Sequence, residues 1–160
     1  ARGFSLFFKE QNLSDIMNEI IHEFGPLAKV NKLSLTADIQ PSIIAMVDAE
    51  ALKKILLNLI NNAVKYAAGE VYIQAYDNGI TDQFTCIVKN DGPLIAPNEA
   101  QHIFSPFNRL TRTSHLPGTG LGLALAKSLT ELHNGSLELQ ANSEEKNIFV
   151  LTLPRSKPTT

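Results

Sequence analysis

The stretch "LPGTGLGLALAKSLTELHNG", Leu116–Gly135, places Gly118, Gly120 and Gly122 directly before an apolar segment with helical character. Each glycine costs about 0.5–1 kcal/mol of backbone entropy relative to alanine, so a local requirement is expected. A helix N-terminus offers unpaired N–H groups and a partial positive charge, which makes phosphate the usual reason for such a loop. A simple hinge into a core helix explains this stretch, taken alone, equally well.

Two familiar phosphate-binding loops do not fit the spacing. A Walker loop reads G-x-x-x-x-G-K-[ST], but Lys127 follows Ala126, and Leu121 stands where the first glycine belongs. A dinucleotide-binding fingerprint reads G-x-G-x-x-G after a strand, and its third glycine would fall on Leu123. The loop therefore belongs to neither class.

Length and composition bound the kind of protein. The 160 residues are 44% hydrophobic and 19% charged, with a net charge of −2, which is typical of one soluble globular domain and unlike a basic nucleic-acid binder. Cys86 is the single cysteine, which leaves neither a disulfide framework nor a cysteine metal site. No apolar segment approaches the roughly 18–20 residues of a membrane span, and no signal peptide is evident. The chain begins with Ala1 rather than Met, so we expect it to be part of a larger protein.

Hydrophobic periodicity predicts an α+β fold. Apolar residues at helical spacing predict helices from Asn12 to about Asn31 and from about Ala49 to Ala67, with Asn12 and Asp48 as N-caps. Alternating patterns predict strands in "FSLFFKEQ", "LSLTADI" and "IIAMV", a hairpin of "EVYIQAY" with "QFTCIVK", and a final pair of "SLELQA" with "NIFVLTLP". This order predicts a two-layer sandwich, with one sheet covered by helices on one face. We expect a single domain over residues 1–154, followed by a disordered tail or linker at 155–160.

The second predicted helix carries an unusual polar face in "ILLNLINNAVKYA", residues 55–67. Asn58 and Asn62 are four residues apart and share a face, and Lys65 and Tyr66 follow one turn later. An amide oxygen suits Mg²⁺, a lysine suits phosphate and a tyrosine ring can stack on a base. The alternative is a solvated polar face on a surface helix.

A long connection follows the hairpin, "VKNDGPLIAPNEAQHIFSPFNRL" at residues 88–110. Connections of this length inside a domain are more often functional lids than neutral loops. Arg109 and Arg112 lie in this region and are suited to phosphate. We therefore expect a lid from about Ala96 to Pro117.

The order of these motifs resembles the ATP-binding catalytic domain of bacterial sensor histidine kinases. The asparagine helix, the Asp-Gly-Pro turn, the Phe-x-x-Phe lid and the Gly-x-Gly-x-Gly helix appear in the family's sequence order, from about Asn12 to Pro154. The wider superfamily includes type II topoisomerases, heat-shock ATPase chaperones and mismatch-repair ATPases. The resemblance implies the Bergerat ATP-binding fold, a mixed, mostly antiparallel sheet of about five strands against three main helices, with ATP and Mg²⁺ bound beneath a lid.

The resemblance also implies roles for individual residues. Asn58 would be the Mg²⁺ ligand, Asn62 and Lys65 would face the phosphates, and Tyr66 would lie near the base. Phe104 and Phe107 match the family's F box, and the implied catalytic residues are Asn58, Lys65 and Arg109. The implied nucleotide-binding residues are Asn58, Asn62, Lys65, Tyr66, Asn90, Gly92, Ile95, Phe107, Gly118, Thr119, Gly120, Leu121, Gly122 and Leu123.

Two positions depart from the family's pattern. Asn90 stands where the family has an aspartate that accepts a hydrogen bond from the adenine amino group. An amide keeps an acceptor oxygen but loses the charge, which lowers such a bond from about 1.5–3 to about 1 kcal/mol. Asp91 is a candidate substitute, and Leu94 replaces a second glycine, which should stiffen the start of the lid.

The activity that the resemblance implies is transfer of the ATP γ-phosphoryl group to a histidine on a dimerisation domain outside this chain. A response regulator would then receive it, and the domain would be cytoplasmic in a membrane-anchored parent, touching neither nucleic acid nor membrane. One alternative is an ATPase of the superfamily, in which a glutamate four residues before the asparagine activates water. Lys54 holds that position here, and a protonated lysine is no base. The other alternative is a degenerate nucleotide-binding module.

The four histidines indicate neither a phosphoacceptor site nor a metal site. His22, in "HEFGPL", resembles the family's phosphoacceptor motif, but the match is one residue short, and we expect an ordinary helical residue. His102, His115 and His133 show no metal-ligand spacing and are expected at the surface.

Overall fold

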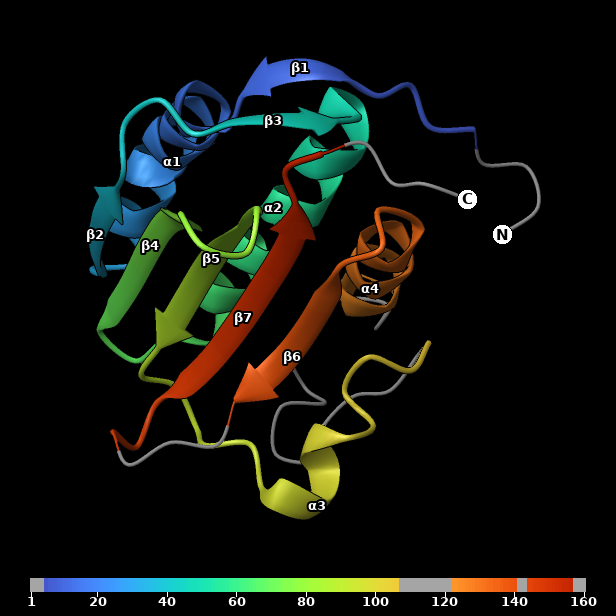
Figure 1. Ribbon diagram of the computed structural model, residues 1–160. Helices are drawn as coiled ribbons and strands as arrows, with labels where there is room; N and C mark the ends of the chain where they lie inside the picture. Colours follow the sequence, from blue (N-terminus) through green and yellow to red (C-terminus); the bar gives the residue numbers. More distant parts are fainter. Residues whose placement is uncertain (1–4, 107–121, 141–143, 157–160) are drawn as a thin grey trace.

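A five-stranded sheet forms one layer of the protein, with strand order β2-β4-β5-β7-β6 (Figure 1). The computed structural model describes residues 5–106, 122–140 and 144–156. Strands β2 and β4 are parallel, and the other neighbours in this sheet are antiparallel. The strands are β1 Lys9–Asn12, β2 Ser34–Ile39, β3 Ile44–Val47, β4 Glu70–Asn78, β5 Gln83–Asn90, β6 Ser136–Gln140 and β7 Asn147–Pro154; the helices are α1 Leu13–Val30, α2 Ala49–Tyr66, α3 Pro97–Ala100 and α4 Gly122–Leu132.

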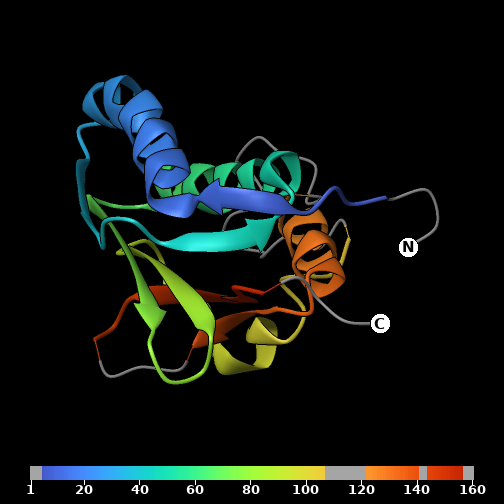
Figure 2. The same cartoon turned by 45° about the horizontal axis from the view of Figure 1, so that its top comes forward.

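Three long helices form the second layer. Helices α1, α2 and α4 lie on one face of the sheet, and α2 runs between the other two (Figures 1 and 2). The core lies between the layers and includes Ile55, Leu59 and Val64 of α2 and Phe84 and Val88 of β5. The predicted α+β sandwich with a mostly antiparallel sheet is therefore confirmed.

The helix starts follow the predicted caps. The Asn12 side-chain oxygen accepts a hydrogen bond from the Asp15 N–H at 3.1 Å, and Asp48 accepts one from the Ala51 N–H at 3.0 Å. Each cap satisfies an N–H group that the first helical turn leaves without a partner. Both helices begin and end within one residue of the predicted limits.

A separate two-stranded ribbon joins β1 to β3 in antiparallel register. The predicted first strand therefore begins later than expected, at Lys9, and lies outside the main sheet. Arg155 holds the other side of β3: its carbonyl accepts from the Met46 N–H at 2.8 Å, and its Nε donates to the Ile44 carbonyl at 3.1 Å. Arg155, just after β7, thus contacts β3 through both its backbone and its side chain.

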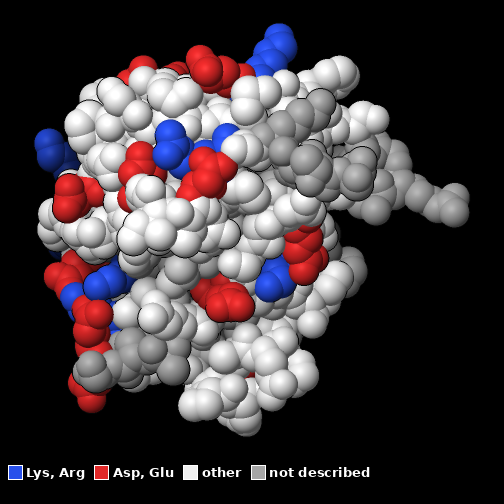
Figure 3. All heavy atoms as spheres, in the orientation of Figure 1, with Lys and Arg blue, Asp and Glu red and all other residues white. Residues whose placement is uncertain are grey.

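Cys86 lies on β5, with neighbouring strands on both sides, and has no solvent exposure. Burial raises the pKa of its thiol to about 12, because the thiolate would lose its hydration. Within residues 5–106, 122–140 and 144–156, no helix has both the length and the apolarity needed to cross a bilayer. On the face drawn in Figure 3, acidic and basic side chains are intermixed rather than gathered by sign.

Candidate functional site

The polar face of α2 lies at the border between core and solvent. Asn58, Asn62, Lys65 and Tyr66 are half-buried, whereas Asn61 on the same helix is exposed. The helical period brings the first four to one side, and the apolar residues between them point into the core. The structure therefore confirms that Asn58 and Asn62 share a face of the helix, as the sequence predicted.

The Asn58 amide has a fixed orientation. Its Nδ2 donates to the Lys54 carbonyl at 2.9 Å, so its Oδ1 points away from the helix backbone. A Cβ built on Gly122, the first residue of α4, would lie 3.0 Å from that oxygen. The start of α4 and the middle of α2 therefore approach closely at Asn58, and a glycine at residue 122 leaves room around its oxygen. A hard oxygen ligand at this place fits Mg²⁺, which prefers such ligands.

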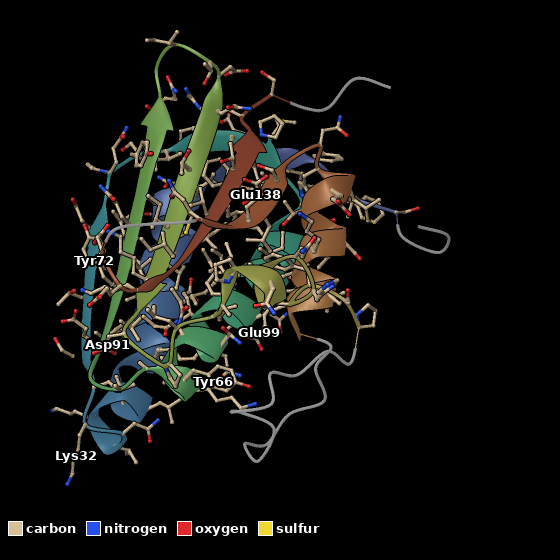
Figure 4. The ribbon with its side chains drawn as sticks, turned by 90° about the horizontal axis from the view of Figure 1, so that it is seen from below. Lys32, Tyr66, Tyr72, Asp91, Glu99 and Glu138 are labelled. Carbon is tan, nitrogen blue, oxygen red and sulfur yellow. The ribbon has the colours of Figure 1, made fainter. Side chains whose placement is uncertain are left out.

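The turn after β5 packs against the end of α2. A Cβ on Gly92 would lie 2.2 Å from the Tyr66 carbonyl oxygen, so only glycine fits without a shift of the backbone. The Lys65 ammonium lies 5.3 Å from the centre of the Tyr66 ring, within cation–π range. Tyr66 projects from the end of α2, on the side of the molecule that Figure 4 faces. The turn, the ring and the ammonium thus share one corner of the fold.

Asn90 ends the buried face of β5. The alternation of the strand buries Phe84, Cys86, Val88 and Asn90, and only 2% of Asn90 is exposed. Its Oδ1 accepts hydrogen bonds from the Gly92 N–H at 2.9 Å and from Asn147 Nδ2 at 3.3 Å. The oxygen expected to read the base therefore already has two donors within the protein.

Asp91 follows Asn90 in the sequence and organises the turn between α2 and β4. Its carboxylate accepts hydrogen bonds from the backbone N–H groups of Ala68, Gly69 and Glu70 at 2.9–3.1 Å (Figure 4). Burial alone would raise the pKa of this carboxyl group, but these hydrogen bonds outweigh it and hold the pKa below its ordinary value. Asp91 thus has a structural task that competes with a role as a substitute for Asn90.

Phe104 anchors the segment that follows α3. Its ring meets Phe149 of β7 edge-to-face at 6.2 Å, and the Lys127 ammonium of α4 lies 5.2 Å from its centre. Ile95 and Leu123 also pack against the core. These contacts join the residue before the predicted lid, one residue within it and the start of α4 to the body of the domain. The other residues predicted for the lid and the glycine loop lie outside the described residues, namely Phe107, Arg109, Arg112, Gly118, Thr119, Gly120 and Leu121.

The sequence analysis did not predict the buried, hydrogen-bonded positions of His133 and Asn147. His133 was expected at the surface, but only 1% of it is exposed. Its Nδ1–H donates to the Leu129 carbonyl at 2.8 Å, and its Nε2 accepts from the Asp48 N–H at 3.3 Å, so it joins α4 to the start of α2. Asn147 was not singled out at all, and the only signal in the sequence is a polar residue at the head of an apolar strand.

Comparison with known proteins points to one family. Residues 47–157 match the family described as "Histidine kinase-, DNA gyrase B-, and HSP90-like ATPase". The chain is 30% identical to the sensor histidine kinase TmoS of Ectopseudomonas mendocina, over 99% of the chain and 16% of that protein. It is 32% identical to the sensor protein KdpD of Escherichia coli K12, over 96% of the chain and 17% of that protein. The chain thus spans about a sixth of the length of these two relatives.

Solved structures agree with this assignment. The catalytic domain of histidine kinase ThkA, in a nucleotide-free form, superposes with a TM-score of 0.83 at 26% identity, covering 95% of this chain and 98% of that one. Full-length ShkA in complex with AMPPNP superposes with a TM-score of 0.84 at 22% identity, covering 100% of this chain and 34% of that one. The second likeness concerns the fold alone.

Proposed function

This chain belongs to the family of histidine kinase-, DNA gyrase B- and HSP90-like ATPases, and we propose that it is the ATP-binding catalytic domain of a sensor histidine kinase. The reaction is transfer of the ATP γ-phosphoryl group to a histidine on a dimerisation domain outside this chain. The parent protein would be membrane-anchored with this domain in the cytoplasm, and a response regulator would accept the phosphoryl group downstream.

The observation that carries the proposal is the close approach of Asn58 to the start of α4. The Asn58 oxygen faces Gly122, while its nitrogen is held by the Lys54 carbonyl. This arrangement supports Asn58 as the ligand of a Mg²⁺ ion that accompanies the triphosphate and neutralises part of its charge. Asn62 and Lys65, on the same side of α2, would contact the phosphates, and Tyr66 would lie beside the base.

In phosphoryl transfer the protein mainly positions the groups and stabilises charge. Lys65 would supply a positive charge to the phosphates from α2, and Arg109 would supply another from the lid. Ile95, Gly92 and Leu123 would shape the pocket, and the loop of Gly118, Thr119, Gly120 and Leu121 would bring the start of α4 to the phosphates. The N-terminus of that helix favours anions.

The kinase reading is favoured over a hydrolysing ATPase by Lys54. Its backbone carbonyl orients Asn58, and its side chain is exposed at the position where the hydrolysing relatives need a base. An exposed ammonium group does not activate water at neutral pH. A degenerate nucleotide-binding module is the other candidate, because Asn90 and Leu94 depart from the family's pattern.

Calorimetry and phosphotransfer test this proposal together. We expect the chain to bind ADP and a non-hydrolysable ATP analogue more tightly with Mg²⁺ than without it, and to hydrolyse ATP very slowly alone. Adding the parent protein's dimerisation domain should produce acid-labile phosphohistidine from labelled ATP. Rapid steady-state hydrolysis by the isolated chain would favour the ATPase, and absence of nucleotide binding would favour the degenerate module.

A further inference from the structure

Two buried asparagines face each other at one edge of the main sheet. Asn90 is the last residue of β5 and Asn147 is the first residue of β7, and the antiparallel register places them directly opposite each other. They are 2% and 4% exposed. Buried amides of this kind need defined hydrogen-bond partners, so the partners fix which way each amide points.

Backbone groups set the orientation of Asn147. Its Oδ1 accepts from the Ile95 N–H at 3.0 Å, and its Nδ2 donates to the Pro93 carbonyl at 3.0 Å. A backbone N–H only donates and a carbonyl only accepts, so a flipped amide would lose both bonds. The Asn147 group that reaches Asn90 is therefore an N–H donor.

The same reasoning fixes Asn90. Its Oδ1 accepts from the Gly92 N–H and from Asn147 Nδ2. Turning the amide over would set its NH₂ group against two donors, which costs both hydrogen bonds and leaves buried donors unpaired. Asn90 is thus held with its oxygen toward the protein and its nitrogen on the opposite side.

The Asn90 nitrogen is the atom left for a ligand. None of the hydrogen bonds among residues 5–106, 122–140 and 144–156 uses Asn90 Nδ2 as donor. No fully buried side-chain nitrogen or oxygen in the same part of the chain lacks a partner, so Nδ2 is not sealed inside the protein. Among these residues it is an unpaired donor with slight solvent exposure, beside the turn of Gly92.

We propose that Asn90 reads the nucleotide base as a hydrogen-bond donor, so that this site takes 6-oxopurine nucleotides at least as well as adenine nucleotides. This inference rests on the proposed function, which places the base beside Tyr66. The turn of Gly92 packs against the Tyr66 carbonyl, and its N–H donates to Asn90, so Asn90 lies at the same corner of the fold. A donor suits O6 of a 6-oxopurine or N1 of adenine, and it does not suit the 6-amino group of adenine. An aspartate at residue 90 would present an acceptor instead and would select the 6-amino group.

The first test uses the unmodified protein and three nucleotides. Calorimetry with Mg²⁺ compares ADP, IDP and purine riboside 5′-diphosphate, which lacks any group at position 6 but keeps N1. We expect IDP to bind as tightly as ADP or more tightly, and the purine riboside to bind within about twofold of ADP, since the 6-amino group makes no bond to Asn90. ADP binding about tenfold or more tighter than both others would overturn the inference. If none of the three binds, the proposed function itself fails.

The substitution Asn90→Asp replaces the hydrogen-bond donor proposed to face the base with an acceptor. Asn90→Asp keeps an oxygen for Gly92 and Asn147 and replaces the nitrogen with an acceptor of nearly the same size. We expect the ratio of the IDP to the ADP dissociation constant to rise by about tenfold or more. Asn78→Asp is the matched control, because Asn78 is exposed at the far end of β4 and its side-chain oxygen accepts a hydrogen bond from the Ile80 N–H there. Its ratio should equal that of the parent.

An unchanged ratio in Asn90→Asp, in a protein that still unfolds cooperatively, would show that the base does not meet residue 90. The comparison of ADP, IDP and purine riboside 5′-diphosphate on the unmodified protein stands even if this variant fails to fold. The two measurements also separate a polarity effect from a general loss of affinity, because a merely loosened pocket would weaken all three nucleotides alike.

Discussion

Helix α2 carries polar side chains at both ends, and their partners differ. At the N-terminal end the partners lie within the protein. Asp48 accepts from the Phe7 N–H at 2.8 Å and from the Ala51 N–H at 3.0 Å, and its own N–H donates to His133. Burial alone would raise the pKa of Asp48, but the backbone N–H groups that donate to its carboxylate outweigh it and hold the pKa below its ordinary value.

Along the C-terminal half of the same helix, the pairing is incomplete. The Asn58 nitrogen donates to the Lys54 carbonyl, and its oxygen lies toward Gly122. The Lys65 ammonium lies over the ring of Tyr66. A polar group whose partners are all protein atoms stabilises the fold, whereas one that is oriented but only partly paired is prepared for a ligand. Within this one helix, the hydrogen-bond partners thus distinguish polar side chains that stabilise the fold from polar side chains that are suited to bind a ligand.

Removing the N-terminal cap should produce the largest effect. Asp48→Ala loses the helix cap and leaves the Phe7 N–H without its acceptor, so we expect the free energy of unfolding to fall by about 3 kcal/mol. Urea denaturation measures it. Glu50→Ala is the matched control, an exposed acidic residue in the same turn, and should change stability by less than about 0.5 kcal/mol. Equal losses in both variants would remove the contrast between the two ends.

Gly92→Ala tests how tightly the turn closes on the other end of the helix. The new Cβ would clash with the Tyr66 carbonyl oxygen, so we expect a loss of about 2 kcal/mol in unfolding free energy. Gly79→Ala serves as the control, because nothing lies within 4 Å of a Cβ built there. A Gly92→Ala protein as stable as the control would mean that the turn shifts freely relative to α2.

Asn58→Ala should separate binding from stability. Because the Asn58 oxygen accepts no hydrogen bond within residues 5–106, 122–140 and 144–156, we expect the unfolding free energy to stay within about 0.5 kcal/mol of the parent. Affinity for ADP in the presence of Mg²⁺ should fall about tenfold, which is about 1.4 kcal/mol. Asn61→Ala, exposed on the same helix, should change neither quantity. A destabilised Asn58→Ala with unaltered Mg²⁺ dependence would assign this amide to the fold.

The smallest effect concerns acid stability. The folded protein lowers the pKa of Asp91, so its charged form stabilises the fold fully above the ordinary carboxyl pKa. That contribution is lost as the pH falls through the folded value. We expect Asp91→Asn to be less stable than the parent by about 1 kcal/mol at pH 7. This gap should close as the pH falls below the ordinary carboxyl pKa and through the lower pKa of the folded protein.

Denaturation curves across this range measure the gap. Asp38→Asn, on the exposed part of β2, is the control. A gap that stays constant with pH would mean that the three backbone hydrogen bonds do not depend on the charge of residue 91.

Local patterns were sufficient to predict most of the fold. The caps at Asn12 and Asp48 and the alternation along β5 follow from residues close together in the sequence. The polar face of α2 was also predicted, because the helical period alone brings Asn58 and Asn62 together. These features depend on spacing within one element, which the sequence states directly.

The partners across the fold could not be predicted. His133 is buried by contacts with Asp48, 85 residues away, and with Phe8, whose ring it meets edge-to-face at 5.2 Å. The contact of Asn147 with Asn90 depends on the register between β5 and β7, since a shift of one residue would turn the Asn147 side chain to the other face of the sheet. The orientation of Asn90, and so the polarity of the group that faces the proposed ligand, depends on that register.

Because Cys86 is buried on a central strand, its thiol can serve as a natural probe of transient opening of the sheet. Thiol reagents attack the thiolate, and a fully buried thiol with a pKa of about 12 offers almost none. Labelling of this single cysteine therefore requires separation of the central strands, so its rate reports how often the sheet opens. Nucleotides that bind only the closed sheet should slow this labelling, and thiol modification would then measure their affinity without any introduced label.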